Sequence, residues 1–470
     1  LIVRSMNRTI VLLSALALPA VLAEAKTDRP NFVIVMADDM GWGDLAANGS
    51  NRLVKTPQLD AMAASGLRLT RCYATSPQCT PTRAGFLTGR HPSRYACYCA
   101  GGRPLPTEAI TMAELLGKAG YATGHFGKWH VGGVSIREPH GPRAQGFVEQ
   151  YSIVNSYMVH KMDVTFTGSG KGKGQKSSGY CEDVVMDAAL KFVRTNAQKK
   201  QPFLAVIWNL APHDPFLAPE VDRKPYAHLS EKEQHYWGQI TNIDKNVGRL
   251  RRALREHGVA DNTMLVFTSD NGAVKYSRDH DPFKGGKNNL WEGGLRVPGL
   301  IEWPARIKKP FVSDVPVNLV DLFPTVLEAA GVDVPDDIGE LDGISLLPLL
   351  DGKLKSRPKP MGFHFLHQRW QSNLERKKEK FLSGVGTVGF AVIDDNYKLI
   401  TNLRGESAQL YDVVSDPGEK QDLAADKPEI VMKLQNWRKQ WWASVVEDQK
   451  KIGIQFDPQS LQPLSTTGKK

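Results

Sequence analysis

The sequence predicts an α/β fold with a large, mostly parallel sheet flanked by helices, followed by a smaller C-terminal subdomain. A continuous apolar run, typical of a strand buried on both faces, occurs at residues 31–37, and three further strand candidates lie at residues 121–125, 203–208 and 263–268. Segments with helical periodicity lie beside them, at residues 57–65, 80–87, 182–195 and 231–257. Because strands that alternate with helices pair in parallel, we expect helices on both faces of one sheet.

The pattern changes after residue 350. Short β-like segments follow one another at residues 361–366, 387–393, 397–401 and 409–413, with a hairpin turn at 394–396. An amphipathic helix over 427–446 and a polar tail close the chain. We therefore expect a main domain over 26–355, a C-terminal subdomain over 356–450 with a short antiparallel sheet and a terminal helix, and a polar tail over 451–470.

The first 25 residues have the pattern of a secretory signal peptide with upstream residues. A short basic region follows Met6, an apolar run covers 9–18, and Ala23-Glu-Ala25 matches a small-x-small cleavage site. The apolar run is shorter than the roughly 20 residues that span a bilayer, and no later run is long enough to do so. We expect an exported protein, periplasmic or secreted, that begins near Lys26 and has no membrane span; a buried N-terminal helix is the alternative.

The composition is that of a globular protein with a basic surplus. Hydrophobic residues make up 41% and charged residues 23% of the 470, which excludes a disordered, collagen-like or coiled-coil chain. The net charge of +10 favours an anionic partner such as a nucleic acid, an acidic polysaccharide or a membrane surface. Nucleic acid is disfavoured because no basic helix or aromatic-basic sheet motif is present. The Gly-rich basic segment 168–179 lacks the spacing of a phosphate-binding loop and is predicted to be a surface loop.

Five cysteines are an odd number for an exported protein, so one thiol needs a separate fate. If Cys79 is that thiol, the other four could form two disulfides in three connectivities. Those four are Cys72, Cys97, Cys99 and Cys181. The close spacing of Cys97 and Cys99 disfavours a bridge between these two.

Acidic residues follow two of the predicted parallel strands. Asp38 and Asp39 come after the first strand, and Asp270 and Asn271 after the run that ends at 268. Taken alone, each pair is also typical of a turn. Open α/β sheets place their sites at the carboxyl ends of strands, however, so these side chains form a candidate site. Three carboxylates and one amide oxygen suit a hard cation such as Ca²⁺ or Mg²⁺ rather than zinc.

A cysteine and several basic residues complete the candidate set. Cys79 directly precedes the predicted helix that carries Arg83, and a cysteine at a helix N-terminus has a lowered pKa and is reactive; a buried structural thiol is the alternative. A lone histidine is more often structural. Basic groups gathered around a metal ion would instead form a cationic pocket for a tetrahedral oxyanion. The candidates are Lys128 and His130 in Gly-Lys-Trp-His, His213 in Ala-Pro-His, and Lys287 in Gly-Gly-Lys.

These motifs occur in a specific order along the chain. The order is Asp-Asp-Met-Gly-Trp-Gly-Asp, Cys-x-Pro-x-Arg with Leu-Thr-Gly-Arg, Gly-Lys-Trp-His, Pro-His, Ser-Asp-Asn-Gly, and Gly-Lys with Trp-Glu-Gly-Gly, followed by a tail motif from Tyr397 to Glu419. It resembles the type I sulfatase family of the alkaline-phosphatase-like superfamily, over nearly the whole chain after residue 25. Within that family it looks closest to the N-acetylgalactosamine-6-sulfatase and arylsulfatase A branch. The resemblance implies an alkaline-phosphatase-like fold and sulfuric ester hydrolase activity.

The resemblance also implies how the site is completed. Cys79 would be oxidised after translation to formylglycine (3-oxoalanine) by a formylglycine-generating enzyme, which accounts for the odd thiol. One departure is Thr82, where the family usually has serine, and this bears on the efficiency of the modification. Arg83, on the same helix, would orient the aldehyde-derived group. One Ca²⁺ would be held by Asp38, Asp39, Asp270, Asn271 and the modified Cys79.

The implied reaction is hydrolysis of a sulfated carbohydrate or an aryl sulfate through a covalent sulfo-enzyme. Hydrated formylglycine has two hydroxyls, of which one is the nucleophile, made acidic by the cation and deprotonated by Asp270. Lys128 and Lys287 would bind sulfate oxygens and stabilise the developing charge. His213 would protonate the departing alcohol, and His130 would deprotonate the second hydroxyl, which expels sulfate and restores the aldehyde.

Two other functions remain open. A formylglycine-dependent phosphodiester or phosphonate hydrolase would share much of the site, although the set of Lys128, His130 and Lys287 favours sulfate. An inactive sulfated-glycan-binding protein would be expected to have lost Cys79 or Arg83, and both are present. Substrate choice depends on loops near 135–180, 214–230 and 360–385, and family resemblance does not determine it.

Overall fold

The computed structural model describes residues 29–51, 53–135, 137–154, 163–168, 175–274, 276, 281–366, 386 and 388–454. The predicted signal peptide and most of the predicted polar tail lie outside these residues. Among the described residues, no helix combines the length and the apolar character needed to cross a membrane.

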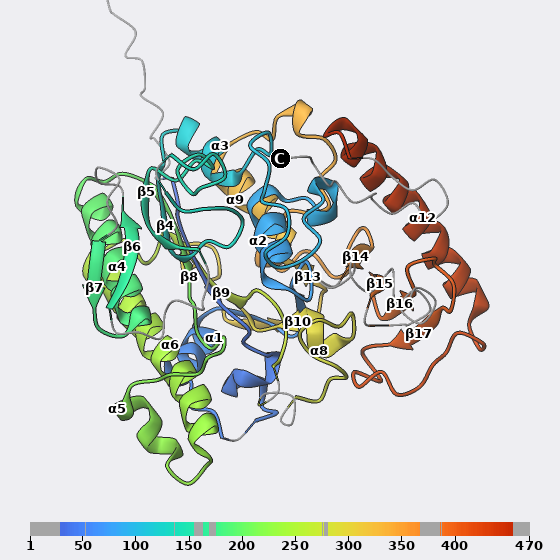
Figure 1. The fold of residues 1–470 in the computed structure, drawn as a ribbon, viewed down its shortest axis with the longest axis horizontal. Helices are drawn as coiled ribbons and strands as arrows, with labels where there is room; N and C mark the ends of the chain where they lie inside the picture. Colours follow the sequence, from blue (N-terminus) through green and yellow to red (C-terminus); the bar gives the residue numbers. More distant parts are fainter. Residues whose placement is uncertain are drawn as a thin grey trace, which may run out of the picture.

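A ten-stranded sheet forms the centre of the molecule (Figure 1). In spatial order its strands are β12 (Phe311–Ser313), β2 (Leu67–Leu69), β11 (Gly299–Glu302), β9 (Thr263–Ser269), β1 (Asn31–Ala37), β8 (Phe203–Trp208), β4 (Ala122–Lys128), β5 (Glu149–Ile153), β6 (Asp163–Gly168) and β7 (Gln175–Ser178). The strands from β9 to β5 are mutually parallel, whereas β11, β6 and β7 pair antiparallel with their neighbours. The predicted large, mostly parallel sheet is therefore confirmed.

The long apolar runs of the sequence are the central strands. The runs at 31–37, 203–208 and 263–268 are β1, β8 and β9, and the run at 121–125 corresponds to β4, which extends to Lys128. Strands of three or four residues, such as β2 and β11, are too short to show a periodicity and escaped prediction. Residues 175–178, predicted as part of a surface loop, form β7 instead, because their backbone pairs with β6.

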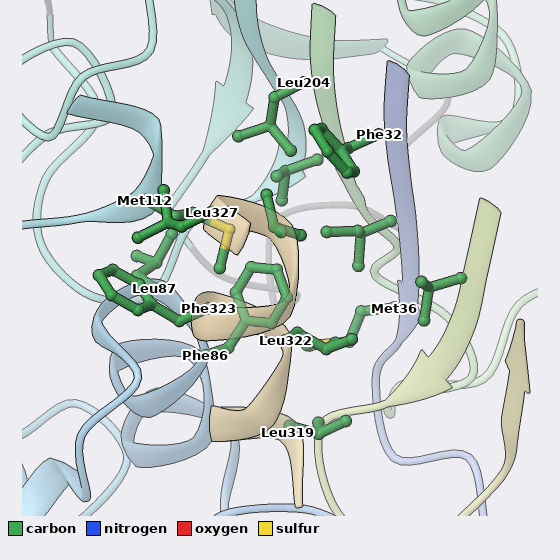
Figure 2. Packing of buried hydrophobic residues seen from close by; sticks show 14 of the residues in the cluster. Phe32, Met36, Phe86, Leu87, Met112, Leu204, Leu319, Leu322, Phe323 and Leu327 are labelled. Carbon is green, nitrogen blue, oxygen red and sulfur yellow. The ribbon is translucent and has the colours of Figure 1, made fainter. Parts of the chain in front are cut away.

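Helices cover both faces of the sheet. One face carries α2 (Cys79–Thr88), α3 (Met112–Lys118), α9 (Leu322–Ala330) and α10 (Leu347–Leu350), and the other carries α1 (Pro57–Ser65), α4 (Cys181–Gln198) and α6 (Glu231–Glu256). Successive side chains of β1 alternate between the two layers, so that Phe32 and Met36 face α2 and α9 whereas Val33 and Val35 face the opposite side. Figure 2 shows the first layer, where Phe323 packs among residues of β1, β8 and α2. This packing fixes α2, and with it Cys79, against the sheet.

The C-terminal part forms a second, smaller sheet with one long helix, together at one side of the molecule (Figure 1). Its antiparallel strands are β14 (Met361–Phe365), β15 (Gly389–Asp394), β16 (Tyr397–Thr401) and β17 (Gln409–Asp412), and its helix is α12 (Pro428–Lys451). Trp441 and Trp442 of α12 pack against Phe390 of β15. The predicted antiparallel sheet and terminal helix are confirmed, and the helix ends at Lys451 rather than at 446. The domain boundary near 355 stays a prediction.

Short elements connect the two parts. They are a three-stranded sheet of β10 (Arg296–Val297), β3 (Cys72–Tyr73) and β13 (Val317–Asn318), and the four-residue helix α8 (Glu292–Leu295). Another four-residue helix, α5 (Glu220–Arg223), packs against α6 instead. Tyr73 of β3 and Leu295 of α8 belong to the same hydrophobic cluster as Phe363 of the C-terminal sheet. The C-terminal part is thus packed directly on the main sheet's connections.

The two disulfides considered from the sequence do not form, since all five cysteines are free thiols. Cys72 and Cys97 lie in the hydrophobic layer on one face of the main sheet, and Cys181 lies in the layer on the opposite face. The sheet therefore separates Cys181 from Cys72 and Cys97. The Sγ of Cys97 is a donor to the carbonyl oxygen of Arg103 at 3.3 Å.

Candidate active site

The acidic residues after β1 and β9 lie together at one edge of the sheet. The two strands pair in parallel up to their last residues, so the segments that follow them emerge side by side. Asp38, Asp39, Asp270 and Asn271 are each 0 or 1% exposed. The backbone N–H of Asp39 donates to Asp270 Oδ1 (3.1 Å), and Asn271 Nδ2 donates to Asp39 Oδ1 (2.9 Å). The topology therefore gathers three carboxyl groups in a site closed to solvent.

Each carboxylate is paired with a basic side chain from another segment. The pairs are Lys128 with Asp38 (2.5 Å), Lys287 with Asp39 (2.7 Å) and Arg83 with Asp270 (2.7 Å). Arg83 also donates to the carbonyl oxygen of Lys128 (3.0 Å) and lies over the ring of Trp208, 4.9 Å from its centroid. Three buried negative charges are thus balanced by three positive ones.

The three carboxyl groups do not share this environment equally. Burial raises the pKa of Asp38, but Lys128 and the other cations outweigh burial and hold that pKa well below its ordinary value. Burial likewise raises the pKa of Asp39, and Lys287 and His213 reverse the effect, so this pKa is also lowered. For Asp270 burial prevails: together with the charge of Asp38 it raises the pKa to about 6, despite Arg83. Asp270 is therefore the member of the set that binds a proton most readily.

Cys79 begins α2 beside these charges and is 1% exposed. Burial raises the pKa of its thiol, although Lys128 and Lys287 oppose this, so the lowered pKa expected from the helix N-terminus is wrong. The hydroxyl of Thr82 accepts from the N–H of Ser76 (3.1 Å) and donates to the carbonyl of the same residue (2.9 Å). A serine hydroxyl could make the same pair of bonds. The threonine at this position therefore fits the local structure without rearrangement.

Glycines allow the site segments to approach one another. Gly127, directly before Lys128, has a φ of 99°, and a Cβ there would overlap the carbonyl oxygen of Trp208. Gly272 donates its N–H to Gly294 (3.0 Å), and a Cβ on Gly272 would overlap the carbonyl oxygen of Gly293. The segment 270–272 and the Gly-Gly pair of α8 are therefore in backbone contact.

Two histidines border the site in different surroundings. Burial, with the cations Lys128 and Arg83, lowers the pKa of His130 to about 2, so this ring is neutral. Its Nδ1 is buried and has no hydrogen-bond partner in the described part of the chain. His213 donates from Nδ1 to the carbonyl oxygen of Asp214 (2.6 Å), and its Nε2 lies 3.6 Å from Asp39 Oδ2. The neutral ring of His130 is suited to accept a proton, and the Nε2 of His213 faces the carboxylate of Asp39.

The residues of the site fit a divalent metal ion. One ligand atom each of Asp38, Cys79 and Asp270 lie within 4.8 Å of one another, as do atoms of Asp38, Asp39 and His213. The Oδ1 of Asn271 is buried and lacks a hydrogen-bond partner among the described residues. A buried amide oxygen left in this way beside carboxylates is a ready ligand for a hard cation.

Two residues at the site were not identified from the sequence. Trp208, which supports Arg83, ends an apolar run and has the pattern of a core residue. Glu182, whose carboxyl group accepts two N–H bonds from the segment before His213, has the pattern of an ordinary acid in the first turn of a helix. The place of β8 in the sheet brings Trp208 to the site, and the packing of α4 on β4 and β8 brings Glu182 there.

Comparison with protein families gives two matches. Residues 30–332 match the family described as sulfatase, and residues 283–443 match the one described as N-sulphoglucosamine sulphohydrolase, C-terminal. The chain is 33% identical over 390 residues to the N-acetylgalactosamine-6-sulfatase of Mus musculus, an alignment that covers 75% of this chain and 72% of the relative.

Solved structures share the fold. The structure of Ps i-CgsB in complex with k-i-k-neocarrahexaose superposes with a TM-score of 0.77 at 27% identity, over 88% of this chain and 92% of that one. The phosphonate monoester hydrolase of Agrobacterium radiobacter has a TM-score of 0.64 at 21% identity, over 93% of this chain and 99% of that one, which shows likeness of fold alone.

Proposed function

The chain belongs to the sulfatase family of sulfuric ester hydrolases, and from this premise we propose that it hydrolyses the sulfate ester of a carbohydrate with a formylglycine made from Cys79. The observation that carries the proposal is the meeting of Cys79 with three carboxyl groups and three cations in one buried site at the strand ends. A formylglycine-generating enzyme would carry out the oxidation, and the protein would be exported. The hydroxyl of Thr82 makes two hydrogen bonds with the backbone of Ser76 that a serine could also make, which supports modification of this motif.

We assign one Ca²⁺ to Asp38, Asp39, Asp270, Asn271 and the modified Cys79. When bound, it would supply two positive charges that favour the ionised form of a hydroxyl on the Cys79-derived group. Because the protein charges of the site are balanced, the ion would also give the site a net positive charge, which attracts an anionic ester. The Oδ1 of Asn271, which has no hydrogen-bond partner among the described residues, supports this assignment.

The basic side chains would recognise the sulfate group. Lys128 and Lys287 are held near the nucleophile by Asp38 and Asp39, so their charges are in place before the substrate arrives. Arg83 would keep Asp270 ionised, because its guanidinium donates two bonds to one carboxylate oxygen. Asp270 would take the proton of the attacking hydroxyl, for which a pKa of about 6 is suitable near neutral pH.

The two histidines would move the remaining protons. His213, close to Asp39 and Asp214, would donate from Nε2 to the oxygen of the departing alcohol. His130, neutral and with Nδ1 unoccupied by any described residue, would accept the proton when sulfate leaves. Each transfer is worth about 10²–10⁴-fold in rate.

We propose a sulfated sugar as the substrate class, because one relative is named N-acetylgalactosamine-6-sulfatase and one similar structure holds a neocarrahexaose. The basic balance of the chain, +10, would attract such polyanions. A panel of sulfated mono- and oligosaccharides, assayed by release of inorganic sulfate, would identify the sugar and the sulfate position.

The proposed function is tested by release of sulfate and of phosphate from matched aryl esters with Ca²⁺, for the wild type beside Cys79→Ala. The protein is produced in a host that makes formylglycine, and peptide mass spectrometry reports the state of Cys79. We expect sulfate release that vanishes in the variant. Dominant phosphate release would favour the phosphonate or phosphodiester alternative, and an unmodified, inactive Cys79 would favour a glycan-binding protein.

A further inference from the structure

Glu182 is a buried carboxyl group in the first turn of α4, 2% exposed. Its Oε1 accepts the backbone N–H groups of Leu210 (2.9 Å) and Ala211 (2.8 Å). Its Oε2 is buried and has no hydrogen-bond partner in the described residues. A single oxygen thus holds two consecutive N–H groups of the segment that leaves β8.

This segment is connected to the active site at both of its residues. The carbonyl oxygen of Leu210 accepts from the N–H of His213 (3.3 Å), and that of Ala211 accepts from the N–H of Asp38 (3.0 Å). The Nε2 of His213 then lies 3.6 Å from Asp39. The contact made by Glu182 therefore holds the backbone of His213 and the backbone of Asp38 in place relative to each other.

The helix that presents Glu182 is itself well anchored. The next residue, Asp183, accepts through Oδ1 from the side-chain amides of Asn242 (3.2 Å) and Asn246 (2.8 Å) on α6. Val185 and Met186 are buried in the layer between α4, α6 and the sheet. A group on such a helix can hold a loop in one position more closely than a group on another loop.

We propose that Glu182 is a positioning residue that holds the segment 210–213, and thereby His213, in place beside Asp39. The inference rests on the proposed role of His213 as the proton donor to the leaving alcohol. Burial raises the pKa of Glu182 to about 8, so the group is uncharged near neutral pH and acts through its carbonyl oxygen. Glutamine offers an oxygen at the same place, whereas leucine offers none.

Asp244 on α6 provides a matched control. It is 2% exposed, its Oδ1 accepts the N–H groups of Gln58 (2.9 Å) and Leu59 (2.8 Å), and burial raises its pKa to about 7. These two partners belong to the first turn of α1, on the layer away from α2. Asp244 thus makes the same kind of contact without holding a site segment.

The test compares phenyl sulfate with 4-nitrophenyl sulfate in the full-length modified enzyme. The phenolate of the first is far more basic, so its departure depends on proton donation, whereas nitrophenolate leaves without it. We expect Glu182→Leu to lower kcat for phenyl sulfate about 100-fold and for 4-nitrophenyl sulfate less than about 5-fold, and Glu182→Gln to stay within about 3-fold on both. Asp244→Leu and Asp244→Asn should change both substrates by equal factors.

The variant His213→Ala distinguishes a failure of the inference about Glu182 from a failure of the proposed role of His213. Suppose that His213→Ala lowers kcat for phenyl sulfate selectively. If Glu182→Leu then lowers kcat for both substrates equally, or if Glu182→Gln lowers kcat as much as Glu182→Leu does, the inference is wrong and the role of His213 stands. If His213→Ala lowers kcat for both substrates equally, His213 is not the proton donor and the inference about Glu182 is wrong as well. Should Glu182→Leu fail to fold, Glu182→Asp, one methylene too short to reach both N–H groups, must show the same selective loss.

Discussion

Two of the buried ion-pair clusters among the described residues are built differently. One is the site cluster of Asp38, Asp39, Asp270, Arg83, Lys128 and Lys287 at the ends of β1 and β9. The other, here named the C-terminal cluster, consists of Glu292, Arg296, Lys398 and Glu419. In it, Lys398 lies 3.0 Å from a carboxylate oxygen of Glu292 and 3.0 Å from one of Glu419, and Arg296 lies 3.3 Å from Glu292.

In both clusters acids and bases are equal in number, but the clusters differ in the hydrogen-bond partners of the neighbouring polar atoms. The C-terminal cluster is further tied by Tyr73, which donates to Glu292 (3.0 Å), and by the N–H of Glu292, which donates to Glu419 (2.7 Å). Beside the site cluster, Asn271 Oδ1 and His130 Nδ1 have no hydrogen-bond partner among the described residues, whereas Glu419 Oε1 of the C-terminal cluster, which also lacks a hydrogen bond, is ion-paired with Lys398 at 3.0 Å. A cluster whose polar groups are paired with one another stabilises the contact between two parts of a fold. A cluster with unpaired polar atoms beside it is suited to bind a ligand.

The largest effect should follow from removing the central cation of the C-terminal cluster. Lys398→Met leaves Glu292 and Glu419 buried without it, and we expect the free energy of unfolding to fall by about 3–5 kcal/mol. Urea denaturation measures this, and kcat of the folded fraction should stay within about 3-fold. Lys433→Met is the control, because Lys433 pairs with Asp394 at the surface and its loss should cost less than about 1 kcal/mol. Equal losses for the two variants would contradict the distinction between a buried and an exposed pair.

The corresponding change in the site cluster should act on rate instead. Lys287→Met removes a cation proposed to bind sulfate, and we expect kcat for an aryl sulfate to fall about 10²–10³-fold, which is about 2.7–4 kcal/mol of barrier. Lys284→Met tests the same loop outside the cluster, since Lys284 is exposed and lies over the ring of Trp291. That control should keep its activity within about 3-fold. If Lys287→Met destabilised the fold as much as Lys398→Met while retaining kcat, the two clusters would have the same role.

Calcium should distinguish the clusters by stability. At a free concentration of 100 times its Kd, a bound ion stabilises the folded protein by about 2.7 kcal/mol. We expect Ca²⁺ to raise the Tm of the wild type and of Glu292→Gln alike, and Asn271→Ala to lose most of this increase because it lacks the amide oxygen. Differential scanning calorimetry with Ca²⁺ and with a chelator measures the difference. An undiminished increase in Asn271→Ala would remove that residue from the ligand set.

The comparison also explains what the sequence could reveal. The central strands, the antiparallel C-terminal sheet and the terminal helix were predictable because each depends on a local pattern of apolar residues. The candidates at the ends of β1 and β9 could be found because parallel strands carry their following residues to one edge. The basic residues of other segments were candidates because they lie in short polar motifs, and the resemblance to the sulfatase family then implied their roles.

The rest depends on contacts between distant segments. The C-terminal cluster joins residues 292, 398 and 419, and no local pattern indicates that Lys398 of β16 is buried between two glutamates. The expected low pKa of Cys79 was wrong because burial, which a sequence does not display, outweighs the neighbouring cations. The disulfides considered for Cys181 were wrong because the sheet separates it from Cys72 and Cys97.

The smallest predicted effect is a dependence of calcium affinity on pH. Asp270 has a pKa raised to about 6 by burial and by Asp38, whereas the pKa values of Asp38 and Asp39 are lowered, so Asp270 is the carboxyl group of the site that titrates between pH 5 and 7. A cation binds the ionised form, so below pH 6 each binding event releases a proton and the apparent Kd should rise about tenfold per pH unit, or about 1.4 kcal/mol. Above pH 6 the group is already ionised and the affinity should become constant. Calcium titrations of the wild type and of Glu292→Gln should give the same profile, because Glu292 belongs to the C-terminal cluster. An affinity that stayed constant down to pH 5 would show that Asp270 is ionised throughout, held by Arg83 more strongly than burial opposes it.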